Sequence, residues 1–185
     1  MKKKILILLL IPIIFIGLTG CGKTNIEKKD DGKKSIVLED KKLGLKTTFK
    51  YEDKLNISDI EFSDEGASKS VEFDMEDQDA EVEMYYTSMS DTSYKNSQDI
   101  RSKQKHYKEY KFGKYQGYAF SEYDSNLKLN IILNENDNKM YDVLFVDIER
   151  LDTDQTIIMS EIFDNEEFQE LFNSINFVKT TNKQQ

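Results

Sequence analysis

The sequence predicts an α+β domain built on a twisted antiparallel β-sheet of about six to seven strands, with a mid-chain helix and a C-terminal helix packed on its faces. Three observations support this. Apolar and polar residues alternate strictly over several segments, clusters of Asn, Asp, Ser and Gly separate these segments, and one segment near the C-terminus has helical periodicity. The strand-rich order with few helices favours an antiparallel meander over βα units.

Alternation of apolar and polar side chains predicts half-buried strands, each with one face on the core. The apolar faces are carried by Leu45, Thr47, Phe49 and Tyr51, by Val71, Phe73 and Met75, by Val82, Met84 and Tyr86, and by Leu127, Leu129, Ile131 and Leu133. Residues 140–148 are apolar on both faces, which predicts a central strand covered on both sides. Residues 134–138 predict a hairpin loop before it.

Two helices are expected. Asp164 is a candidate N-cap with Glu167 at N3, and Phe163 and Phe168 stand at the hydrophobic-staple positions. The apolar residues that follow have the spacing of one helix face, and they are Phe168, Leu171, Phe172 and Ile175. A second helix, weaker in its apolar stripe, is expected over residues 94–107.

The first residues predict export. Three lysines follow Met1, and residues 5–18 form a mainly apolar run of 14 residues. A membrane-spanning helix needs about 20 apolar residues, so the run is typical of a signal peptide. Residues 18–21, Leu-Thr-Gly-Cys, resemble the lipobox of bacterial lipoproteins. The resemblance implies a diacylglycerol thioether on Cys21, cleavage before it, and acylation of the new amine by a fatty acid such as palmitate.

The expected organisation follows from these signals. Residues 1–20 are a lipoprotein signal peptide, residues 21–34 a lipidated cysteine with a polar, flexible tether, residues 35–179 a single domain, and residues 180–185 a disordered tail. The protein is then expected on the extracytoplasmic face of the cell membrane, held by its lipid. Cys21 is the only cysteine. The alternative to lipidation is that Cys21 is an ordinary thiol that happens to follow an apolar segment.

The domain itself resembles PsbP/Mog1-like domains. The resemblance is carried by the strand 45–51, the helix near residues 93–106, the strand 107–112, the segment Gly117-Tyr118-Ala119-Phe120 and the closing residues 172–177. The chain lacks the Pro and Trp common near the early strand of such domains. The family is mostly composed of binding or assembly modules, so the resemblance implies no enzymatic activity.

Composition argues against several partners. Residues 1–20 hold three of the 26 basic residues and none of the 35 acidic ones, so their removal changes the formal charge from −9 to −12. Such a chain repels nucleic acid. Arg101 and Arg150 are its only arginines, which leaves little capacity for bidentate phosphate binding.

Residues 17–24 match the nucleotide-binding pattern G-x-x-x-x-G-K-[ST], and residues 143–147 resemble its companion acidic strand. A phosphate loop must open a helix that packs on the core. Residues 25–34 have no apolar face to form that helix, and the expected cleavage removes Gly17 and Gly20. We therefore expect no nucleotide binding.

Other candidate groups have simpler interpretations. His106 is the only histidine, and lysines nearby suggest a solvated helix end. The acidic residues Asp74, Glu76, Asp77 and Asp79 form either a solvated hairpin tip, which is favoured, or a Ca²⁺ site. Five tyrosines crowd one segment and could form sheet faces or an exposed binding patch; they are Tyr107, Tyr110, Tyr115, Tyr118 and Tyr123.

The sequence thus predicts a membrane-anchored, non-enzymatic binding or assembly module of unknown ligand. No cofactor or metal site is expected. The alternative is an envelope hydrolase that acts on glycans through carboxylates such as Glu122 and Asp124. A hydrolase requires two opposed acids in a cleft, whereas a binding module should present aromatic or apolar side chains to solvent.

Overall fold

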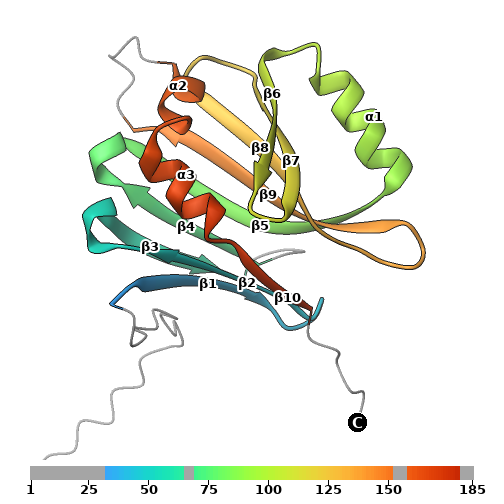
Figure 1. Cartoon of the computed structure of the whole chain (residues 1–185), viewed down its shortest axis with the longest axis horizontal. Helices are drawn as coiled ribbons and strands as arrows, with labels where there is room; N and C mark the ends of the chain where they lie inside the picture. Colours follow the sequence, from blue (N-terminus) through green and yellow to red (C-terminus); the bar gives the residue numbers. More distant parts are fainter. Residues whose placement is uncertain (1–31, 65–68, 152–157, 180–185) are drawn as a thin grey trace, which may run out of the picture.

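The computed structural model describes residues 32–64, 69–151 and 158–179 (Figure 1). The expected signal peptide, Cys21 with its lipobox, nearly all of the tether, the G-x-x-x-x-G-K-T segment and the tail 180–185 lie outside these residues. Within the described part of the chain, the helices are too short or too polar to cross a membrane.

The described residues form mostly antiparallel β-structure with a few helices, which confirms the α+β class. The expected single sheet is wrong, because ten strands divide into a seven-stranded and a three-stranded sheet. Across the large sheet the order is β3 (Ile57–Ser63), β4 (Ser70–Met75), β5 (Ala80–Ser90), β9 (Met140–Arg150), β8 (Asn126–Glu135), β7 (Tyr115–Ser121) and β6 (Lys105–Phe112). The small sheet has the order β1 (Lys34–Asp40), β2 (Leu45–Tyr51) and β10 (Asn176–Lys179).

The strand predictions from alternation are confirmed at β2, β4, β5 and β8. Strand β9 occupies the centre of the large sheet, as its two apolar faces predicted. Its inner residues Leu144, Val146 and Ile148 are fully buried, and Val143 on the other face is buried too. A residue pattern that is apolar on both faces therefore identified the covered strand correctly.

The mid-chain helix is shorter than expected. Helix α1 spans Asp91–Arg101, and the Ser90 hydroxyl caps it by accepting a bond from the Ser93 amide at 3.1 Å. The expected end at residue 107 is wrong, because residues from Lys105 onward pair with β7 as strand β6. The polar stripe of α1 offered no apolar periodicity to mark where the helix stops.

The C-terminal apolar stripe is confirmed, but its cap is not. Helix α2 (Met159–Phe163) precedes helix α3 (Glu166–Asn173), and the residue at the N-cap of α3 is Asn165. Asp164 instead accepts hydrogen bonds from Lys108 at 2.7 Å and from the Tyr110 hydroxyl at 2.8 Å. The Asp164 carboxylate, which the local sequence predicted as the helix cap, is thus bound by side chains of the distant strand β6.

The core lies between the inner face of the large sheet and a layer made of the small sheet, α2 and α3 (Figure 1). Phe172 of α3 meets Phe49 of β2 edge to face, with ring centroids 6.1 Å apart. The Tyr86 hydroxyl, from the large sheet, donates to the Leu38 carbonyl and bonds Thr47, both at 2.8 Å, in the small sheet. These contacts join the two sheets and leave the outer face of the large sheet for α1.

Candidate functional site

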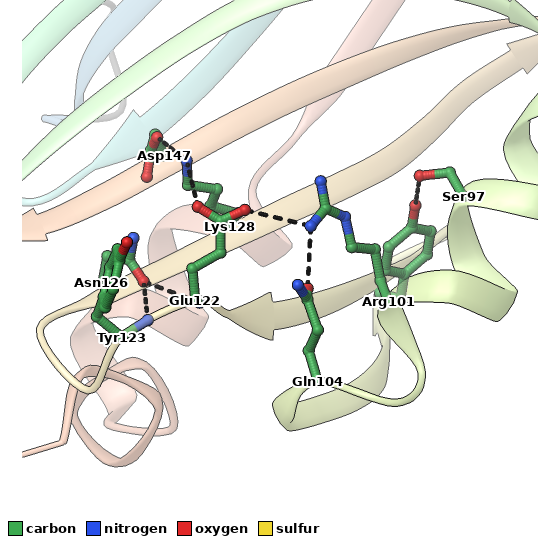
Figure 2. A network of polar contacts seen from close by, with 9 residues as sticks. Ser97, Arg101, Gln104, Glu122, Tyr123, Asn126, Lys128 and Asp147 are labelled. Carbon is green, nitrogen blue, oxygen red and sulfur yellow. Dashed lines mark hydrogen bonds and ion pairs between the residues drawn. The ribbon is translucent and has the colours of Figure 1, made fainter.

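The two carboxylates proposed for hydrolysis lie in the turn between β7 and β8. The buried Asn126 shapes this turn, because its Oδ1 accepts from the backbone amides of Glu122 and Tyr123 at 3.2 and 3.1 Å. Glu122 then lies between two cations, 3.2 Å from Arg101 and 3.5 Å from Lys128 (Figure 2). It is therefore one member of a network of alternating charges.

This network crosses the outer face of the large sheet. Lys128 continues it to Asp147 of β9 at 3.2 Å (Figure 2). Arg101 also stacks over the Phe120 ring, with its guanidinium carbon 4.6 Å from the ring centroid. The ion pairs tie the end of α1 to β8 and β9. Both carboxylate oxygens of Glu122 are thus engaged in ion pairs with neighbouring side chains.

Asp124 is held in a similar way. Its Oδ1 lies 3.2 Å from His106 Nε2 and 3.5 Å from Lys105 Nζ. The hydrogen bond from His106, followed by the charge of Lys105, lowers the pKa of Asp124. The prediction that His106 ends a helix is wrong, because His106 lies in a bulge of β6 with φ 54°.

Of the four acidic residues expected at a hairpin tip, Glu76, Asp77 and Asp79 lie in the turn after β4, as favoured from the sequence, whereas Asp74 lies within β4. The short helical turn after β4 is η2 (Glu76–Gln78), and Asn56 Nδ2 donates to Glu76 at 3.0 Å. Asp79 lies 3.6 Å from Arg150, a cation that a calcium ion would have to displace or tolerate. Among the described residues no three His, Cys, Asp or Glu side chains are arranged so that they could hold one metal ion.

Sequence reasoning missed a set of carboxylates that strand register brings together on the outer face. Glu72 lies opposite Glu83, and Glu83 lies opposite Asp147; in the next row Asp74, Glu81 and Glu149 are neighbours in the same way. Like charges directly opposite one another destabilise a sheet. Partial burial, followed by repulsion from neighbouring acids, raises the pKa of Asp74, Glu81 and Glu83.

The tyrosine-rich segment does not form one exposed patch. Tyr115 and Tyr118 are buried, Tyr110 packs edge to face on Phe163 at 5.3 Å, and only Tyr123 among the five is mainly exposed, at 69%. Tyr107 is half-buried beside Tyr118, with centroids 5.9 Å apart. Alternation along β6 and β7 sends these rings to both faces of the sheet.

A groove does open beside α1 on the outer face, and we call it the α1 groove. It consists of two adjoining cavities of about 440 and 380 Å³ that share Gln116, Ile132 and Tyr141. The first cavity reaches α1 and β6, and the second reaches the β6–β7 turn and the end of β8. The other lining residues used below are Lys95, Gln98, Glu109, Lys111, Lys114 and Glu135.

Gly117 of β7 also lines the α1 groove. A Cβ atom on Gly117 would lie 2.4 Å from the carbonyl oxygen of Asn130 in β8. No side chain fits that distance. Glycine therefore allows β7 and β8 to approach closely along the floor of the groove.

Hydrogen bonds hold the walls of the groove. The Tyr141 hydroxyl donates to Asp91 at 2.7 Å, which raises the pKa of Tyr141 to about 12 and lowers the pKa of Asp91. Gln98 Nε2 donates to the Tyr107 hydroxyl at 3.0 Å and to Glu109 at 3.1 Å. The side chains of Tyr141 and Tyr107 are thus held in position by hydrogen bonds on these walls.

Comparisons of the chain with protein-family models, with curated proteins and with solved structures found no match.

Proposed function

We propose that this chain is a bacterial lipoprotein, anchored through Cys21 on the extracytoplasmic face of the cell membrane, that acts as a non-enzymatic binding module. The α1 groove is its binding site. The observation that carries the proposal is the composition of the groove, where fixed tyrosine rings and an isoleucine lie beside amide and charged side chains. Ligand sites in proteins combine a volume of this order, aromatic and apolar walls, and a few polar groups.

The position of the groove is consistent with a lipid anchor at the N-terminus. The described chain enters the fold at Lys33, which pairs with Glu170 of α3 at 3.3 Å. Helix α1 lies at the upper right of Figure 1, and the start of β1 lies at the lower left. The described chain thus begins at the end of the fold opposite α1.

The proposal includes the finer fold assignment, a PsbP/Mog1-like domain. It is supported by the antiparallel sheet with helix α1 in mid-chain and helix α3 near its end. The negative charge of the chain favours neither nucleic acid nor nucleotide as a partner. The hydrolase alternative has less support, since Glu122 and Asp124 both lie within 3.5 Å of cations.

A site-specific photocrosslink tests this function in cells. A benzophenone amino acid replaces Gln116, an exposed residue in the groove, in the full lipid-anchored chain. The matched control carries the same group at Tyr123, which is exposed but outside the groove. Adducts with an envelope component from position 116 alone are expected. Equal adducts at both positions, or none at 116, would contradict the proposed site.

A further inference from the structure

The shape of the α1 groove suits an elongated ligand. Its two cavities adjoin at Gln116, Ile132 and Tyr141, so a ligand that fills one continues into the other without leaving the sheet surface. The two cavities together extend from α1 toward the hairpin between β8 and β9. A chain of similar units placed side by side fits this outline better than one compact molecule.

The charges of the groove nearly cancel. Three lysines, Lys95, Lys111 and Lys114, face two glutamates, Glu109 and Glu135. Lys95 is paired with the Asp91 carboxylate at 2.9 Å. The groove therefore offers little net attraction to a strongly charged ligand, in contrast to the carboxylate rows elsewhere on the same sheet face.

The polar groups of the groove are suited to hydroxyl groups. The Gln116 side chain is exposed, and an amide of this kind presents two donors and one acceptor. Lysine and glutamate side chains add further donors and acceptors. Beside them the Tyr141 ring and Ile132 offer apolar surface, and the Tyr141 hydroxyl is already bonded to Asp91. Pyranose rings combine apolar C–H faces with hydroxyls at their edges, which matches this arrangement.

We propose that the α1 groove binds an uncharged oligosaccharide, a ligand class that rests on the proposed function of the same site. The apolar surface of Tyr141 and Ile132 contacts the sugar faces, and Gln116 bonds the hydroxyls. The Gln98–Tyr107–Glu109 hydrogen bonds keep the opposite wall in place.

Titration calorimetry of the full chain in detergent micelles tests the ligand class. The probes are an N-acetylglucosamine tetramer and cellotetraose, with heparin as the anionic comparison. Saturable binding of at least one neutral tetramer is expected. Gln116→Ala should weaken it about three- to tenfold, the equivalent of one net hydrogen bond. Tyr123→Ala, outside the groove, should bind as the parent chain does.

Several outcomes would overturn the saccharide proposal: no heat from either tetramer, binding of heparin alone, or binding that Gln116→Ala leaves unchanged. The photocrosslink at position 116 distinguishes failure of the saccharide proposal from failure of the proposed binding role. If it captures an envelope component while no tetramer binds, the ligand class is wrong and the binding role stands. If both fail, the groove is not the binding site.

Discussion

Replacing Glu83 by glutamine should stabilise the protein. Glu83 lies in β5 between Glu72 of β4 and Asp147 of β9, so two carboxylates face it directly across the ladder. Cross-strand pairs contribute about 0.2–1 kcal/mol each, and like charges carry the unfavourable sign. Removing the charge relieves two such pairs, which gives an expected gain of about 0.4–2 kcal/mol in the free energy of unfolding.

Urea unfolding followed by circular dichroism measures this change as a shift of the midpoint at constant slope. The matched control is Glu39→Gln, because Glu39 of β1 lies opposite Lys46 of β2, a pair of opposite sign. The control should leave stability unchanged or lower it slightly. High salt should shrink both effects, since screening weakens interactions between exposed charges.

The pH dependence of the same measurement has a defined sign. A carboxyl whose pKa is higher in the folded state favours folding once it is protonated, and this contribution is lost as pH rises through the folded pKa. Asp74, Glu81 and Glu83 belong to this class. The contribution of these three groups should therefore rise as pH falls from neutrality into their titration range, while Asp91, Asp124 and Glu170, whose pKa values are lowered, act in the opposite direction. The advantage of Glu83→Gln over the parent chain should fade in that range. An advantage that is constant with pH, or a midpoint that Glu83→Gln does not raise at neutral pH, would refute the reasoning.

Further predictions follow from the core, the anchor and the excluded nucleotide site. Leu171→Ala should lower the free energy of unfolding by about 2–5 kcal/mol in urea titrations, because Leu171 is fully buried; an unchanged midpoint would mean that α3 is not docked. Cys21→Ala should abolish lipidation and lipoprotein-type cleavage, measured by intact mass and fractionation, and a parent chain unmodified at Cys21 would end the lipoprotein hypothesis. Lys23→Ala should be silent, and the parent chain should neither bind nor hydrolyse Mg-ATP in calorimetry and ATPase assays; micromolar binding that the variant loses would reverse this.

Local periodicity was sufficient for the elements whose environment is regular. The alternation around Val82, Met84 and Tyr86 reflects a sheet with one face on the core, and in β5 it holds from Ala80 to Tyr86. The stripe through Leu171 and Phe172 likewise reflects one buried helix face. Burial in a regular strand or helix repeats with the period of that element. The apolar face can therefore be identified from the local sequence alone.

Features that depend on distant partners were not accessible in this way. Asp164 has the residue type and spacing of a cap, yet Lys108 and Tyr110, more than 50 positions away, bind it instead. The division into two sheets depends on β10 pairing with β2 across most of the chain. Secondary-structure propensity describes one segment at a time. Which strands pair depends on the free energies of alternative pairings between segments that are distant in the sequence.

The outer face of the large sheet shows what that limitation means for function. Register places Glu72, Glu83 and Asp147 in one row and brings Gln116, Ile132 and Tyr141 into one groove. In the sequence, none of these residues differs from an ordinary strand residue. The most exposed tyrosine of the tyrosine-rich segment, Tyr123, lies outside the groove. The charged row raises the free energy of the fold, while the groove beside it is nearly neutral and held by hydrogen bonds. Regions of one face thus differ in charge, and this difference is the physical reason to seek a neutral ligand at the groove and a pH effect at the row.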